Sequence, residues 1–127
     1  MVLSLNEQTF KEEVLEAPTP VLVNFWAPWC GLCRTIDPIL NAFAQEWGEQ
    51  IKLVGINADR TLKLASGYRI TTLPTLILFD SGVALHRIEG FHGRDDLQAM
   101  LRSRMREVMQ KRFVTRSLEH LINSSSV

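Results

Sequence analysis

Two cysteines three residues apart are the feature of this 127-residue sequence with the clearest chemistry. Cys30 and Cys33 flank Gly31 and Leu32 where a short apolar run gives way to a helical pattern. This spacing at the start of a helix is typical of a redox-active dithiol. The unpaired N–H groups of a first helical turn favour a thiolate at Cys30, the form that attacks disulfides. We therefore expect Cys30 to be the exposed nucleophile, and Cys33 to resolve the mixed disulfide.

Two alternatives for this cysteine pair stay open. A zinc site would need a second Cys or His pair at ligand spacing, and the sequence has none. Inert core cysteines would lie in apolar surroundings, whereas Trp29, Gly31 and Leu32 indicate an exposed setting at the end of a strand. We expect no metal and no bound cofactor beyond the redox-active disulfide Cys30–Cys33 itself.

The residues around the pair predict a buried strand followed by a helix. Residues 20–27 form a nearly continuous apolar run bounded by proline, which is typical of a strand buried on both faces. Residues 31–47 have apolar side chains at helical spacing, with Pro38 in the first turns. The remaining elements continue an alternating α/β order: a helix over 6–16 capped by Ser4, strands over 51–57, 75–79 and 83–88, a short helix over 59–66 ended by Gly67, and a long helix from Arg94.

The last part of the sequence differs from the rest in charge. The 14 basic and 14 acidic residues balance overall, so we expect no nucleic-acid partner. Residues 102–127, however, have six basic and two acidic side chains. We divide the chain into a domain of residues 1–108 and a basic helical C-terminal extension of residues 109–127. The extension is a longer closing helix with a solvated basic face, a docking helix for a partner or a second copy, or a membrane-surface helix, of which we do not favour the last.

The sequence also allows a prediction of the cellular location of the protein. The first residues lack a basic segment followed by an apolar one, and no later segment has the roughly 18 consecutive apolar residues of a membrane span. The two cysteines close a loop too short to act as a structural staple. We therefore expect a soluble, cytoplasmic protein.

Separated motifs match one family pattern in identity and order: residues 21–34, Pro38, residues 57–59, residues 73–79, Gly82 and Gly90. Over about residues 1–108 the sequence resembles the thioredoxin family. The resemblance implies a thioredoxin fold, with a mixed central sheet of four or five strands flanked by helices, here with an extended C-terminal helix. It also implies a cis peptide bond before Pro74 and an apolar rim that receives substrate chains, formed by Trp29, Gly31, Leu32, Leu73, Pro74 and Gly90.

The activity that this resemblance implies is that of a thiol:disulfide oxidoreductase. Cys30 and Cys33 would exchange electrons with protein disulfides, and a thioredoxin-reductase-type electron donor would recharge them. The competing hypothesis is a thioredoxin-fold module that binds partners with little redox turnover. Trp29, the dithiol and Pro74 favour the enzyme, whereas Asn24 and the basic extension favour the binding module.

Three positions depart from the family pattern. Asn24 replaces the aspartate that the family usually keeps beneath the resolving cysteine, so a proton acceptor is missing and reductase activity is expected to be weaker. Gly55 replaces a lysine that often pairs with that aspartate, so both members of a buried charge pair are absent together. Leu32 replaces the proline of reducing members, which we expect to shift the pair toward the oxidising side.

Overall fold

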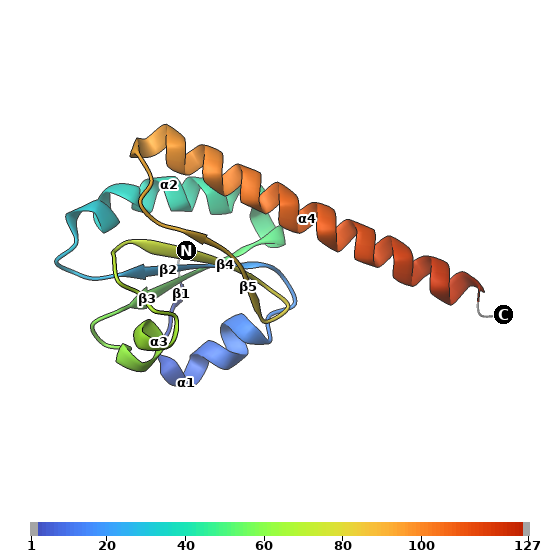
Figure 1. The fold of residues 1–127 in the computed structure, drawn as a ribbon, viewed down its shortest axis with the longest axis horizontal. Coiled ribbons are helices and arrows are strands. Elements are labelled where there is room, and N and C mark those ends of the chain that lie inside the picture. Colours follow the sequence, from blue (N-terminus) through green and yellow to red (C-terminus); the bar gives the residue numbers. More distant parts are fainter. Residues whose placement is uncertain (1–2, 126–127) are drawn as a thin grey trace.

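A computed structural model describes residues 3–125 of the chain, and the side chains of residues 5–123. A five-stranded sheet in the order β1-β3-β2-β4-β5 forms its centre (Figure 1). β1 and β2 pair parallel with β3, whereas β4 pairs antiparallel with β2 and with β5. The mixed sheet expected from the sequence is confirmed, with five strands and β2 at its middle: β1 Leu3–Ser4, β2 Val21–Trp26, β3 Lys52–Asn57, β4 Thr75–Asp80 and β5 Val83–Ile88.

Helices cover both faces of the sheet (Figure 1). One face is covered by α2, Gly31–Trp47, and by the first half of α4, Gly93–Ser125. The other face is covered by α1, Glu7–Phe10, with a π-helical turn over Lys11–Leu15 that continues it, and by α3, Leu62–Gly67. A 3₁₀ turn over Gly48–Gln50 follows α2. The alternating order predicted from the sequence is therefore the observed one.

The side chains of β2 show why the sheet has to be covered by helices on both faces. Successive side chains of a strand point to opposite faces. Leu22 packs in the apolar cluster under α2 and α4, while Val23 and Phe25 pack in the cluster under α1. By the same alternation Asn24 lies on the α2 side, where it is 4% exposed. One polar side chain is thus placed in an otherwise apolar layer.

Two predicted helix boundaries are wrong. Ser4 does not cap the first helix, because it ends β1; Asn6 is the N-cap instead, and its Oδ1 accepts from the backbone N–H groups of Gln8 and Thr9. The short helix begins at Leu62 rather than near residue 59. Asp59 belongs instead to a turn in which its N–H donates to the Asn57 side chain at 2.9 Å.

The closing helix α4 is partly packed and partly projecting. Its buried stripe is Leu97, Leu101, Met105 and Val108, and one turn later Arg112 pairs with Asp80 at 2.5 Å. Arg112 also donates to the Pro18 carbonyl at 3.1 Å. The helix then continues without a break to Ser125 and leaves the body of the molecule (Figure 1). Within residues 3–125, α4 and the other helices are too short or too polar to cross a bilayer.

Candidate active site

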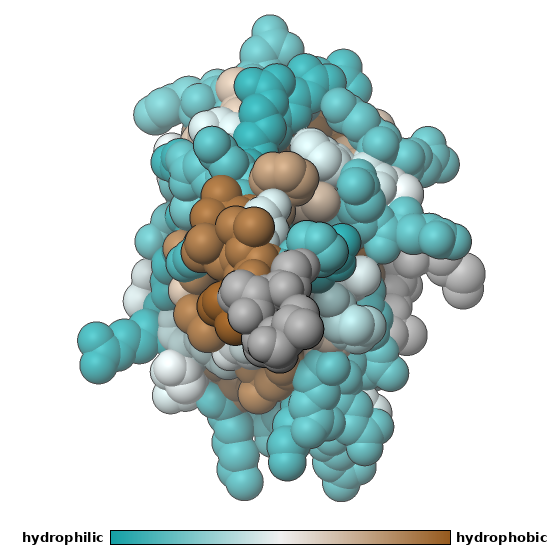
Figure 2. All heavy atoms as spheres, turned by 90° about the vertical axis from the view of Figure 1, so that its right-hand side faces the viewer, coloured by the Kyte–Doolittle hydropathy of each residue, from teal (hydrophilic) through white to brown (hydrophobic). Residues whose placement is uncertain are grey.

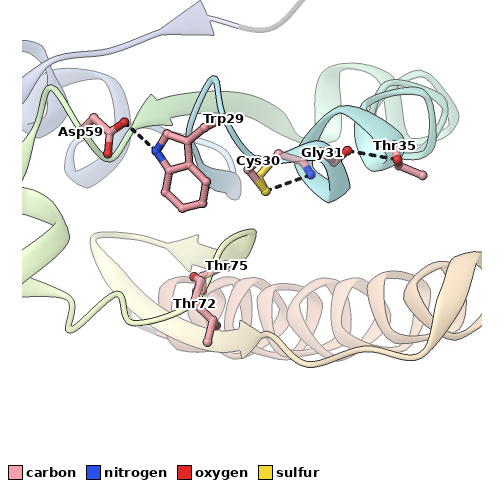
Figure 3. Close-up of a disulfide and its surroundings, with 8 residues drawn as sticks. Trp29, Cys30, Gly31, Thr35, Asp59, Thr72 and Thr75 are labelled. Carbon is pink, nitrogen blue, oxygen red and sulfur yellow. Dashed lines mark hydrogen bonds between the residues drawn. A yellow bond between two sulfur atoms is a disulfide. The ribbon is translucent and has the colours of Figure 1, made fainter.

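Cys30 and Cys33 form a disulfide where the segment after β2 enters α2 (Figure 3). Cys30 is the N-cap of α2, with extended backbone at φ −88° and ψ 104°. Its Sγ accepts a hydrogen bond from the Cys33 backbone N–H at 3.2 Å. The helix N-terminus predicted from the sequence is therefore present, and an N–H group that has no backbone partner within the helix donates to the Cys30 sulfur.

The disulfide is less exposed than the sequence indicated. Cys30 is 6% and Cys33 is 3% exposed, so the prediction of an exposed Cys30 is wrong for this disulfide form. The cause is packing: Ala27 forms one buried cluster with the two cysteines, and Trp26 and Leu73 pack onto this cluster. Exposure falls instead on the neighbours, since Trp29 is 67% and Leu32 is 51% exposed.

Trp29 is held in place by a residue that the sequence analysis did not single out. Its indole Nε1–H donates to Asp59 Oδ2 at 2.9 Å (Figure 3). Asp59 itself is positioned by Asn57 at the end of β3, through the turn described above. An exposed indole with one fixed contact presents its apolar ring beside the disulfide. The signal was available, because residues 57–59 belong to a matched motif, but the pairing with Trp29 is not local in sequence.

The second side of the rim is the loop before β4. The peptide bond between Leu73 and Pro74 is cis, which confirms the expectation from the resemblance. Leu73 packs onto the cysteine cluster, and Thr75 Oγ1 donates to the Thr72 carbonyl at 2.6 Å across this bond (Figure 3). Gly90 is exposed and has a φ of +65°, a left-handed conformation that favours glycine.

A hollow of about 410 Å³, here called the hollow beneath Cys33, lies between α2 and the sheet. Asn24 and Gly55 line it from β2 and β3, where they are register partners, and Cys33 and Asp37 line it from α2. No group of the described residues donates a hydrogen bond to the buried Asn24 Oδ1. Burial raises the pKa of the Asp37 carboxyl above its ordinary value. Asn24 thus lines the same hollow as Cys33, but it offers an amide where the family usually has a carboxylate.

The candidate metal ligands are scattered over the part of the chain that the structure describes. Among residues 3–125 no three His, Cys, Asp or Glu side chains gather closely enough to hold a metal ion. Both cysteines are also joined to each other.

A cysteine pair that joins a central strand to a helix N-terminus, beneath an exposed indole and beside a cis-proline loop, defines a thiol:disulfide oxidoreductase site. The thioredoxin family model matches residues 1–103. The chain is 44% identical to thioredoxin 1 of Synechococcus elongatus over 87 residues, which are 68% of this chain and 81% of that protein. It is 40% identical to the thioredoxin of Porphyra purpurea over 100 residues, which are 79% of this chain and 94% of that protein. The chain belongs to the thioredoxin family and is a protein-disulfide oxidoreductase.

A chloroplastic relative bears on the location expected for the chain. The chain is 44% identical to the chloroplastic M-type thioredoxin of Chlamydomonas reinhardtii over 87 residues, which are 68% of this chain and 62% of that protein. The cytoplasmic location expected from the sequence therefore stays a prediction.

Proposed function

We propose that Cys30 attacks substrate disulfides and that Cys33 resolves the product. In the reduced protein the Cys30 thiolate bonds to one substrate sulfur, and the other substrate sulfur leaves as a thiolate. The Cys33 thiolate then bonds to the Cys30 sulfur, and the substrate sulfur that was bonded to Cys30 leaves as a thiolate. Two electrons pass to the substrate, and the Cys30–Cys33 disulfide is formed. The observation that supports this order is the N-cap position of Cys30, whose sulfur accepts the Cys33 N–H and would be stabilised as a thiolate.

The rim decides what reaches the sulfurs. We propose that an extended substrate chain lies between Trp29 and Leu32 on one side and Leu73, Pro74 and Gly90 on the other, with Gly31 leaving room above the disulfide. Two facts support this: Trp29 and Leu32 are largely exposed apolar side chains, and Leu73 packs against the cysteine cluster. Exposed apolar surface beside a reactive group is typical of a binding site for other proteins.

The wider setting of the activity is also a proposal. Membership of the family supports protein disulfides as substrates and a reductase as the electron donor. We propose a thioredoxin-reductase-type donor, no cofactor beyond the disulfide, and residues 1–108 as the catalytic domain. We further propose electron transport in a reducing compartment such as the cytoplasm, since both cysteines of the sequence belong to the redox pair and none is left for a structural disulfide.

Reduction of insulin disulfides by dithiothreitol tests the proposed function. The wild-type protein should accelerate the reduction, because its dithiol reacts faster than the small thiol and is itself re-reduced. The Cys30→Ser variant is the matched control and should be indistinguishable from dithiothreitol alone. A wild-type protein that gives no acceleration would favour the competing hypothesis of a partner-binding module, which the family comparisons do not favour.

The projecting end of α4 has a feature that this redox chemistry does not use. Val114, Leu118 and Leu121 recur at helical spacing and are at least half exposed. Figure 2 faces this end of the molecule and shows apolar residues gathered on one side of it. The disulfide lies at the other end, where β2 leads into α2 (Figure 1). We propose that this stripe docks on the same stripe of a second copy, since a two-fold pair would bury both stripes and leave both disulfides accessible.

Sedimentation analysis over a range of protein concentrations tests the second copy as occupant. The wild-type protein should dimerise, and Leu118→Lys should raise the dissociation constant by at least about tenfold, because a charge would be buried in the pair. Phe113→Ser is the matched control, since Phe113 is exposed on the same segment but lies outside the stripe. A wild-type protein that stays monomeric at every concentration would contradict the proposal, as would binding of the stripe to anionic vesicles without self-association.

A further inference from the structure

The hollow beneath Cys33 contains one carboxylate. Cys33 and Asp37 are four residues apart in α2, so their side chains lie on the same side of the helix, about 5–6 Å apart at Cβ. Both residues line the hollow. Asp37 is exposed to solvent, whereas Cys33 is buried. The hollow is therefore lined both by the resolving cysteine and by a proton acceptor that can exchange with solvent.

The floor of the hollow is polar at one point. Asn24 is 4% exposed, and its Oδ1 accepts no hydrogen bond from any described protein group. A buried oxygen without a donor is unfavourable, and a water bound beside it would remove this cost by donating a hydrogen bond. The volume of about 410 Å³ is ample for several waters at about 30 Å³ each. Gly55 contributes to this space, because it lies beside Asn24 in the sheet and has no side chain to fill it.

We propose that Asp37 is the proton acceptor for the Cys33 thiol, acting through water bound in the hollow at Asn24 Oδ1. The proposal rests on the resolving role of Cys33 given above. The Cys33 S–H proton passes to the water, and a proton of the water passes to the Asp37 carboxylate. The electron pair left on sulfur forms the bond to the Cys30 sulfur, and the substrate thiolate leaves. Asp37 then returns its proton to solvent.

The charged surroundings of Asp37 are simple. Among the described residues that line the hollow, Arg34 is the other charged side chain, and it lies on α2 as well. The two strands contribute Asn24, Trp26, Leu53 and Gly55, none of which titrates. Burial raises the pKa of Asp37, which brings the carboxylate closer to the strength that a base needs near neutral pH. The chain, which has Asn24 where the family usually has an aspartate, thus has a carboxylate on the helix that covers it.

Reaction of the reduced protein with the disulfide reagent dithionitrobenzoate separates the two steps. The first thionitrobenzoate released reports attack by Cys30, and the second reports resolution by Cys33. In Asp37→Asn the first phase should keep its wild-type rate. The second phase should slow about tenfold near neutral pH, less than the roughly 10²–10⁴-fold of a directly positioned base, because a water intervenes. Its pH dependence should move upward to that of the unassisted thiol.

Two further variants separate a proton acceptor from a structural role. Asp37→Glu should recover part of the lost rate, because it restores a carboxylate at the mouth of the hollow. Glu46→Gln is the matched control: it removes a carboxylate of α2 that pairs with Arg102, outside the hollow, and should leave both phases unchanged. The unfolding midpoint of Asp37→Asn should not fall at neutral pH, because burial disfavours the ionised aspartate and asparagine removes that cost.

The outcomes are distinct. A second phase in Asp37→Asn with wild-type rate and pH dependence would overturn the relay, and a normal first phase would leave the proposed function standing. Equal slowing of both phases in a folded variant would also overturn it, since Asp37 would then act on the whole site. A wild-type protein with no fast first phase would contradict the proposed function itself.

Discussion

Cys33→Ser is expected to turn the protein from a catalyst into a trap. Attack by Cys30 survives, because the helix N-terminus that favours its thiolate is unchanged. Resolution is lost, because the Cys33 sulfur is the one that bonds to Cys30. The effective concentration of a well-oriented intramolecular group can reach roughly 10⁵ M. Removal of the Cys33 thiol should therefore slow substrate release by at least about 10³-fold. Mixed disulfides with insulin should accumulate and should be visible on non-reducing gels.

The reciprocal variant is the control for this trap. Cys30→Ser should form few mixed disulfides, since the remaining Cys33 lies inside α2 and lacks the N-cap position that favours the Cys30 thiolate. The double variant should form none. Equal trapping by the two single variants would contradict the assignment of roles, and so would normal insulin turnover by Cys33→Ser.

The fold could be predicted where one local pattern decides it. The apolar run of β2 and the stripe of α2 each need only a few turns of sequence, and both elements were placed correctly. β1 could not be found this way, because it has two residues and exists through its pairing with Val54 and Gly55. The misplaced start of α3 has a similar cause: Asp59 looks like a helix cap, but Asn57 holds it in a turn.

In the candidate site, too, some features follow from the local sequence and others depend on residues far apart in the chain. The position of the dithiol follows from the junction of strand and helix, which is local. Cys30 is buried in a cluster onto which Leu73, far along the chain, packs, whereas the sequence alone indicated an exposed cysteine. Asp37 was overlooked for a related reason, because its importance depends on the space left by Gly55 on another strand.

Asn24→Asp is expected to raise the rate of disulfide reduction and to lower stability at the same time. The new carboxylate would lie in the hollow beneath Cys33, at a position 4% exposed, and would accept the Cys33 proton more directly than Asp37 does through water. We expect a several-fold faster second phase near neutral pH. Insulin reduction should rise to the extent that resolution limits it.

The stability cost of Asn24→Asp follows from what surrounds the position. Gly55 supplies no cation, and the hollow already contains the Asp37 carboxylate, so an ionised Asp at position 24 would be desolvated and repelled. Its pKa should therefore rise above the ordinary value. A raised acid pKa lowers stability above that pKa and has no effect below the unfolded-state pKa. At neutral pH the unfolding midpoint should fall, and the free energy of unfolding should decrease by about 1–3 kcal/mol. Both should recover toward acidic pH.

A double variant with Asn24→Asp and Asp37→Asn tests whether the carboxylates at positions 24 and 37 accept the same Cys33 proton. If Asp37 is the present acceptor, Asn24→Asp should accelerate resolution by a larger factor in the Asp37→Asn background than in the wild type, because a directly placed base replaces one that is missing. Stability should also fall less in that background, since one negative charge has left the hollow. Equal factors in the two backgrounds would mean that the two residues act independently. An unchanged or slower rate in a folded Asn24→Asp protein would show that proton transfer at this position does not limit turnover, and the cause of any weak reductase activity would then lie at Leu32 or at Glu89 beside Gly90.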